Sequence, residues 1–235
     1  MLSAILFDFG GTLDADGDHW LDRFFAAFER LVPAGPSRAL IKEAFYAANR
    51  ELERDPAIAF CGFRPLIDRH VSRQCDVLGV SDPRLRASLF TAFFEPADRI
   101  LRRNAELLAA LDRDGWGLGV VSNFYGNLQT ICDEYGLTPH LDALLDSAVV
   151  GLSKPDLRLF ALALERLGRA PGDAVFVGDS LDRDLRPAKA LGMKTVWLRD
   201  NVESAEPEAG LVDAVIRSLC ELPALVAAWR VEGMS

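Results

Sequence analysis

Polar side chains with complementary chemistry stand at the ends of successive short apolar runs in this sequence. They are, in chain order, Asp8, Ser122 with Asn123, Lys154, and Asp179 with Asp184 beyond it. A carboxylate can attack phosphorus and form an acyl-phosphate, which divides one difficult hydrolysis into two easier steps. A lysine and a hydroxyl can balance the charge on the oxygens of a transferred phosphoryl group. These residue types, in this order, favour phosphoryl transfer with an aspartate as the nucleophile.

A metal ion would complement the acidic residues of this set. If Asp8 and Asp179 both faced one phosphate, they would repel it unless a hard cation with oxygen ligands were bound, and magnesium fits best. Gly10 and Gly11, which follow Asp8, allow a sharp turn whose backbone amides can face the phosphate. We therefore expect Mg²⁺ as the cofactor.

The apolar runs that carry these residues are typical of strands in a parallel sheet. They are short, rich in Val, Ile and Phe, and without alternation, which suits burial on both faces. The runs span residues 4–9, 118–121, 144–150, 174–177 and 195–198. From about residue 99 onward, helical patterns separate them, over 99–112, 128–135 and 154–167. This alternation predicts an α/β fold with a doubly wound, Rossmann-like parallel sheet, in which ligands bind beyond the carboxyl ends of the strands.

Residues 17–95 interrupt this alternation, because their patterns are helical throughout. The predicted helices span 19–32, 37–55, 63–78 and 83–94, and prolines and glycines occupy the breaks between them. We predict an all-helical cap over residues 17–95 and an α/β core formed by residues 1–16 and 96–235. The cap should move on the core about hinges near residues 14–18 and 95–98, and its closure should exclude water from the site.

Composition disfavours several functional classes. The 235 residues carry 35 Asp plus Glu against 26 Lys plus Arg, and the net charge of −9 disfavours binding to nucleic acid or anionic membranes. The four cysteines show neither CxxC spacing nor nearby paired histidines, which disfavours zinc and suits reduced thiols. No apolar run approaches the ~20 residues that span a bilayer, and the first residues do not resemble a signal peptide. We expect a cytoplasmic monomer or homodimer whose partner is a small phosphorylated molecule.

At its candidate site residues the chain resembles the haloacid dehalogenase-like superfamily of hydrolases. Asp8-Phe9-Gly10-Gly11-Thr12 looks like the first motif of that family, Asp-x-Asp-Gly-Thr. Ser122 looks like the second motif, Lys154 like the third, and Gly178-Asp179 with Asp184 like the acidic fourth. The four motifs occur in order, and the predicted cap resembles the four-helix cap of the phosphoglycolate phosphatase-like branch. The resemblance covers almost the whole chain.

The resemblance implies a role for each matching residue. Asp8 would be the nucleophile and a magnesium ligand, and Lys154 would stabilise both the nucleophile and the phosphate. The substrate-binding residues would be Gly11, Thr12, Ser122 and Asn123, with Thr12 and Ser122 bonded to phosphate oxygens. The metal would be bound by Asp8, Asp179 and the backbone carbonyl of Gly10, and Asp184 would bind it directly or hold its water shell.

One position departs from the family pattern. The second aspartate of the first motif, which protonates the leaving group and later activates water, is replaced here by Gly10. Proton transfer of this kind is worth ~10²–10⁴-fold in rate. The leading hypothesis is a capped phosphatase whose substrate has a good leaving group or its own means of proton transfer. The alternatives are a catalytically weak member that binds a phosphometabolite or a protein partner, and a phosphonate-cleaving enzyme, for which Lys42 is the only lysine in the cap.

Other residues near the motifs have competing interpretations. A substitute acid could come from the run Asp14, Asp16, Asp18 and His19, although such a run is more often a solvated hinge. Phe124 and Tyr125, directly after the second motif, could line the mouth of the pocket or pack in the core. The cap cations are mostly surface charges of which one or two could contact the substrate; they are Arg50, Arg54, Arg64, Arg69, His70 and Arg73.

Overall fold

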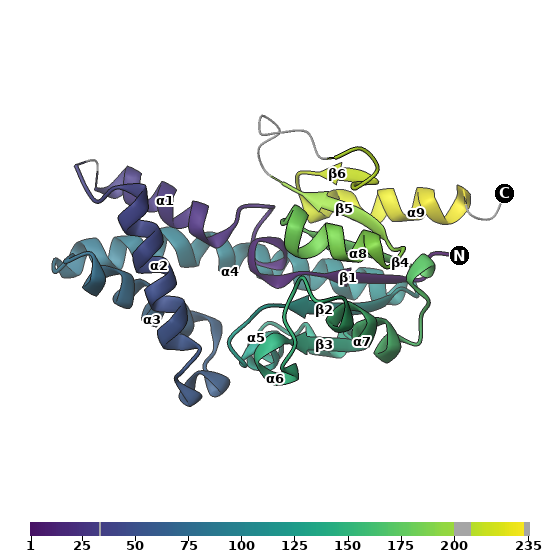
Figure 1. Ribbon diagram of the computed structural model, residues 1–235, viewed down its shortest axis with the longest axis horizontal. Coiled ribbons are helices and arrows are strands. Elements are labelled where there is room, and N and C mark those ends of the chain that lie inside the picture. Colours follow the sequence, from purple (N-terminus) through teal and green to yellow (C-terminus); the bar gives the residue numbers. More distant parts are fainter. Residues whose placement is uncertain (33, 200–207, 233–235) are drawn as a thin grey trace.

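A six-stranded parallel sheet forms the centre of the larger lobe in the computed structural model, which describes residues 1–32, 34–199 and 208–232 (Figure 1). The strand order is β3-β2-β1-β4-β5-β6. The strands are β1 (Ala4–Phe7), β2 (Gly117–Ser122), β3 (Ala143–Asp146), β4 (Ala174–Gly178), β5 (Lys194–Leu198) and β6 (Ala214–Ile216). Every residue of β1 and of β4 is buried, as expected for apolar strands covered on both faces. The predicted doubly wound α/β fold is confirmed.

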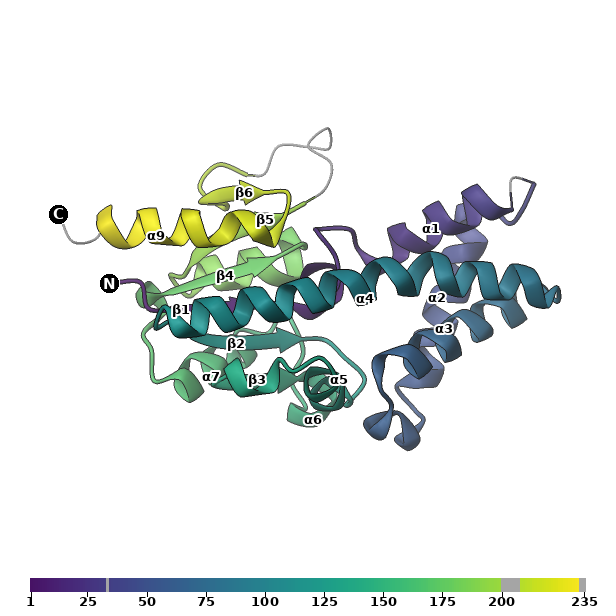
Figure 2. The same ribbon diagram turned by 180° about the vertical axis from the view of Figure 1, so that it is seen from behind.

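Successive side chains of β1 point into two separate hydrophobic clusters, one on each face of the sheet. Ile5 and Phe7 belong to the cluster that contains residues of α4 (Pro83–Arg113), α5 (Leu128–Glu134) and α9 (Leu222–Glu232). Leu6 belongs to the other, with residues of α7 (Leu157–Leu167) and α8 (Arg186–Ala190). Figure 2 shows α4 and α9 crossing one face of the sheet. Because helices cover both faces, the strand ends are where polar side chains can gather.

The smaller lobe is an all-helical insertion after β1, at the place where the sequence predicts the cap, and that name is kept for it. It consists of α1 (Trp20–Leu31), α2 (Arg38–Leu52), α3 (Phe63–Val77) and the first part of α4. Its core is aromatic: Phe24 stacks on Phe93 with ring centroids 4.5 Å apart and on His70 at 5.2 Å. The boundaries at residues 17 and 95 stay a prediction.

The helix α4 corrects one expectation about the connection between the lobes. The sequence predicts two helices, 83–94 and 99–112, whereas the structure has one helix of 31 residues with Pro96 inside it. Proline removes one backbone donor and disfavours the helix locally, but packing on both sides of Pro96 overrides that preference. Phe93 is buried in the cap and Leu108 against the sheet. The second connection between cap and core is therefore helical rather than a loop (Figure 2).

Smaller differences concern element ends. The run 144–150 divides into β3 and a short helix, α6 (Ser147–Val150), because the Asp146 carboxylate accepts a hydrogen bond from Ala148 N at 3.0 Å and caps that helix. Strand β6 was not predicted, since three residues carry too little pattern. Short 3₁₀ turns occur at Pro56–Phe60, Thr138–His140, Pro171–Asp173 and Leu219–Glu221. None of the helices in the described residues combines the length and apolarity that crossing a membrane requires.

Candidate active site

The turn after β1 places Asp8 at the carboxyl edge of the sheet. Asp8 precedes a π-helical turn, Phe9–Leu13, in which Gly10 and Gly11 depart from helical geometry. Gly11 has a φ of +91°, and a Cβ there would lie 2.6 Å from Asp179 Oδ2. Glycine is required at position 11 because a side chain would both strain the backbone and collide with the carboxylate after β4.

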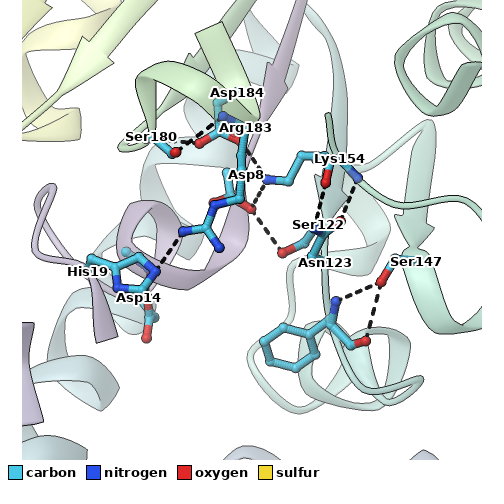
Figure 3. A network of polar contacts seen from close by, with 12 residues as sticks. Asp8, Asp14, His19, Ser122, Asn123, Ser147, Lys154, Ser180, Arg183 and Asp184 are labelled. Atoms are coloured by element: carbon cyan, nitrogen blue, oxygen red, sulfur yellow. Dashed lines mark hydrogen bonds and ion pairs between the residues drawn. The ribbon is translucent and has the colours of Figure 1, made fainter. Parts of the chain in front are cut away.

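Lys154 bridges two buried carboxylates, as Figure 3 shows. Its Nζ lies 2.6 Å from Asp8 Oδ1 and 2.6 Å from Asp184 Oδ1. Ser122 Oγ donates a hydrogen bond to the same Asp8 oxygen at 2.9 Å. Burial alone would lower the pKa of Lys154, but the carboxylates of Asp184 and Asp8 together raise it, so the side chain is a cation at neutral pH.

Asn123 holds the loop that carries Lys154. Its Nδ2 donates to Lys154 O at 3.0 Å, and its Oδ1 accepts from Lys154 N at 2.7 Å. Both polar atoms of the side chain are thereby occupied by the backbone of Lys154. This geometry gives the amide a positioning role for Lys154, and the direct substrate contact expected from the sequence stays a prediction.

Three carboxylates converge beside this lysine. Asp8, Asp179 and Asp184 each offer one oxygen within 4.8 Å of the others. Burial, followed by repulsion from Asp184 and Asp8, raises the pKa of Asp179 well above its usual value. Burial likewise raises the pKa of Asp184 to about 6, although Lys154 opposes the shift.

This acidic cluster suits a divalent cation. Three carboxylates against one ammonium leave negative charge in a desolvated site, which is costly unless a further cation is bound. Carboxylate oxygens are the ligands that Mg²⁺ prefers. The three carboxylates predicted to bind the metal, those of Asp8, Asp179 and Asp184, therefore fit a divalent cation.

A cavity of about 110 Å³ opens between the strand ends and α2. Five of the predicted site residues line it: Asp8, Gly10, Ser122, Asn123 and Lys154. Gly11, Thr12, Asp179 and Asp184 do not. Thr12 is fully buried, and its hydroxyl has no hydrogen-bond partner among the residues that the structure describes. Asp179 lines a neighbouring hollow together with His19 and Arg183.

Two of the candidate substitutes for the missing acid are engaged elsewhere. Asp14 is fully buried and accepts hydrogen bonds from Gly11 N at 2.7 Å and Trp20 Nε1 at 2.6 Å. Asp16 forms a two-pronged ion pair with Arg103 on α4, at 2.7 and 2.9 Å. Both carboxylates fix the linker between β1 and α1 rather than face the cavity.

His19 is the only member of that run that lines the cavity. Its Nδ1 accepts from Leu21 N at 3.2 Å, and its Nε2 lies 2.8 Å from Arg183 Nη2 (Figure 3). Burial and the adjacent Arg183 guanidinium lower the pKa of His19, which keeps the imidazole neutral. A neutral imidazole can accept a proton but is a poor acid near pH 7.

The cap cations singled out from the sequence do not line the cavity. Arg69 pairs with Asp55 and Arg73 with Glu51, both on the cap surface. Arg64 lies over the ring of Phe90, 4.9 Å from its centroid. His70 is fully buried, and Lys42 is exposed on α2 away from the cavity.

Several lining residues were not predicted. Phe45, Tyr46 and Asn49 of α2 approach the core only through the packing of the cap, so nothing near them in the sequence marks them. Arg183 directly precedes Asp184 in the fourth motif, and that neighbourhood was a usable signal. Phe124 and Tyr125 do line the cavity, in agreement with one of the two interpretations considered for them.

Comparison with known proteins agrees with this fold and site. The model of the haloacid dehalogenase-like hydrolase family matches residues 2–192, and the chain belongs to that family. A phosphoserine phosphatase from Thermus thermophilus is 37% identical over 71% of this chain and 67% of its own length. A ribulose-1,5-bisphosphate 5-phosphatase from Halopiger xanaduensis is 28% identical over 89% of this chain and 90% of its own. The crystal structure of a dehalogenase with an intermediate complex superposes with a TM-score of 0.60 at 23% identity, covering 95% of this chain and 96% of the other, and so shares the fold.

Proposed function

We propose that this protein is a magnesium-dependent phosphatase that acts on a phosphorylated small molecule through an aspartyl-phosphate at Asp8. The observation that carries the proposal is the fixed orientation of Asp8 at the cavity. Ser122 and Lys154 both contact Oδ1, so Oδ2 remains to attack phosphorus. The phosphatases among the relatives support the same reaction class.

The first step is the attack of Asp8 on the phosphorus atom, with departure of the alcohol or other leaving group. Lys154 and Ser122 offset charge on the phosphoryl oxygens, and Asn123 keeps Lys154 in place. In the second step water attacks the aspartyl-phosphate, which releases inorganic phosphate and restores the Asp8 carboxylate.

The metal would be held by Asp8, Asp179, Asp184 and the backbone carbonyl of Gly10. When bound, it supplies positive charge that lets an anionic nucleophile and an anionic phosphate approach each other. The helical cap, over residues 17–95, closes above the site and excludes water during the first step.

Gly10 makes the second step slow. No carboxylate follows Asp8 at the position that activates water in the family, so the aspartyl-phosphate should accumulate. Mixing the protein with excess 4-nitrophenyl phosphate and Mg²⁺ should produce a burst of nitrophenolate close to one per active site. Acid quench during the steady state should give a phosphate mass on Asp8, and Asp8→Asn should give neither signal.

The metal is tested separately from turnover. Calorimetric titration should show Mg²⁺ binding to the wild type and much weaker binding to Asp179→Asn, with both proteins equally folded by circular dichroism. Undiminished turnover in excess chelator would contradict the metal dependence. Absence of both turnover and adduct with every phosphate ester would favour the alternative of a catalytically weak member that binds a phosphometabolite or a protein partner. Phosphonate cleavage through a cap lysine has little support, because Lys42 is exposed and does not line the cavity.

A further inference from the structure

The cap side of the cavity is aromatic and uncharged. Trp20, Phe45 and Tyr46 line it from the cap, and Phe124 and Tyr125 face it from the loop after β2. The rings are in mutual contact: the centroids of Trp20 and Phe124 are 6.0 Å apart, and those of Phe124 and Tyr125 are 5.1 Å apart. Such a wall favours a flat apolar group, which gains edge-to-face and stacking contacts.

Asn49 contributes a single polar group to this wall. Its Oδ1 accepts hydrogen bonds from Tyr125 OH at 2.8 Å and from His70 Nε2 at 2.7 Å, and Gln74 Nε2 holds His70 Nδ1 at 2.8 Å. These hydrogen bonds fix the orientation of the Asn49 amide, and its Oδ1 is occupied by two donors. The amide NH₂ is left as the donor that Asn49 can offer to a neutral acceptor on a bound molecule.

Among the residues that the structure describes, no cation lines the cavity from its cap side, where it could pair with a charged leaving group. Its two lining cations, Lys154 and Arg183, both come from the core. Lys154 is neutralised by Asp8 and Asp184, whereas Arg183 contacts the neutral His19 and keeps its charge, but it reaches the cavity from the core and not from α2. A carboxylate or a second phosphate directed at α2 would therefore be desolvated without an ion-pair partner, which is costly.

The missing acid at position 10 points independently to the same kind of leaving group. Without a proton donor the leaving oxygen must depart as an anion. A phenol has a pKa of about 10, as in the tyrosine side chain, whereas an alcohol is closer to water, at about 15.7. An aryloxide is therefore a far better unprotonated leaving group than an alkoxide.

The aromatic wall and the missing acid at position 10 both favour the same substrate class. Resting on the proposed phosphatase function, we infer that the substrate is a phosphate monoester of a small uncharged phenol. Asp8 Oδ2 forms the new bond to phosphorus while the bond from phosphorus to the aryl oxygen breaks. The electron pair leaves on that oxygen, which then takes a proton from water. The whole cavity, including the part beside Asp8 and Lys154, has a volume of about 110 Å³, which is less than the ~150 Å³ that holds one benzene ring, so the phenol has no more than one ring.

Four phosphate compounds separate the argument from the aromatic wall from the argument from the leaving group. Phenyl phosphate has the ring and the good leaving group, benzyl phosphate only the ring, acetyl phosphate only the leaving group, and O-phosphoserine neither. Among the three phosphate esters, the rate constant for adduct formation on Asp8 should be highest for phenyl phosphate, and at least ~10²-fold lower for benzyl phosphate, which has no acid to assist it. As a competitive inhibitor of phenyl phosphate, benzyl phosphate should have an inhibition constant at least about tenfold lower than that of O-phosphoserine. This difference corresponds to the free energy of one or two aromatic contacts.

Tyr46→Lys tests the uncharged wall. Tyr46 is 43% exposed, so the change should spare the cap core, and it introduces a cation beside the leaving group. The preference for phenyl phosphate over O-phosphoserine should fall at least tenfold. Leu40→Lys is the matched control, since Leu40 is 50% exposed on the same helix and does not line the cavity. Its preference should equal that of the wild type.

Binding of stable analogues keeps this inference distinct from the proposed reaction. Calorimetry should show phenylphosphonate binding at least tenfold more tightly than phosphonoacetate. If phenylphosphonate binds more tightly but no adduct forms on Asp8, the proposed reaction is wrong and the inferred ligand class is still supported. Faster phosphorylation of Asp8 by O-phosphoserine than by phenyl phosphate, tighter binding of phosphonoacetate, or an equal shift in Leu40→Lys would overturn the ligand class.

Discussion

Gly10 faces the indole of Trp20: a Cβ at position 10 would stand 3.5 Å from Trp20 Nε1, at ordinary van der Waals distance. The backbone there has a φ of −76°, which any residue can adopt. Trp20 in turn donates its indole hydrogen to Asp14 at 2.6 Å. The backbone and the space at position 10 would therefore accept an aspartate, although the residue there is glycine.

Gly10→Asp should restore acid–base catalysis without straining the turn. Steady-state turnover of benzyl phosphate should rise ~10²-fold or more, the usual worth of a positioned acid, and the burst with 4-nitrophenyl phosphate should disappear. Gly11→Ala is the contrasting variant, because its φ of +91° and the 2.6 Å approach to Asp179 predict loss of activity. If Gly10→Asp keeps the burst and gains no turnover, His19 becomes the first residue to test as the base.

Lys154→Met should separate metal binding from chemistry. The variant loses the ammonium that lies 2.6 Å from both Asp8 and Asp184, so adduct formation should slow by ~10²–10³-fold, as when one transition-state donor is removed. Above pH 7 its Mg²⁺ affinity should be equal or higher, because a competing positive charge has gone. Rapid-quench kinetics and calorimetry measure the two effects. Weakened Mg²⁺ binding with an unchanged phosphorylation rate would contradict the assigned role.

His70 should make the cap sensitive to acid. Burial lowers the pKa of His70 from 6.5 to about 3, so between these values the unfolded chain binds a proton that the folded chain does not. The free energy of unfolding should therefore fall by about 1.4 kcal/mol per pH unit as the pH drops below 6.5, or roughly 2 kcal/mol at pH 5. Urea titrations of wild type and His70→Gln at pH 7.5 and 5 isolate this effect from the site carboxylates. Equal pH dependence in the two proteins would exclude His70 as the cause.

Arg103 should restrain the linker that is predicted to be a hinge of the cap. Its ion pair with Asp16 joins α4 to the linker between β1 and α1, and both side chains are partly exposed. Such a pair is worth at most about 1 kcal/mol. Arg103→Gln should therefore accelerate hydrogen exchange at residues 14–19 by roughly fivefold with little change in melting temperature. Arg102→Gln is matched to it, because Arg102 pairs with Asp98 on the same helix and does not contact the linker. Equal acceleration in both variants would show that the helix, and not the Asp16 pair, controls the linker.

The sequence alone determined that a parallel sheet forms and which residues stand at its carboxyl edge, although it missed β6. Asp8, Ser122 and Lys154 each follow a short apolar segment, and parallel strands bring such positions together whatever the loops do in detail. Hence the contacts of Ser122 and Lys154 with Asp8 were foreseeable, although their atoms and distances were not. The same argument anticipated the meeting of Asp8 with the two later acids.

Tertiary structure decided what depends on packing between distant segments. The sequence predicts two helices, 83–94 and 99–112, whereas packing at both ends of α4 joins them into one helix across Pro96. Asp14 and Asp16 look alike in the sequence, yet one is buried under Trp20 and the other is paired with Arg103, 87 residues away. The approach of Asn49 to Tyr125 likewise depends on how the cap sits on the core. Local patterns report backbone preference and burial, whereas the partner of a polar side chain depends on which surfaces meet after folding.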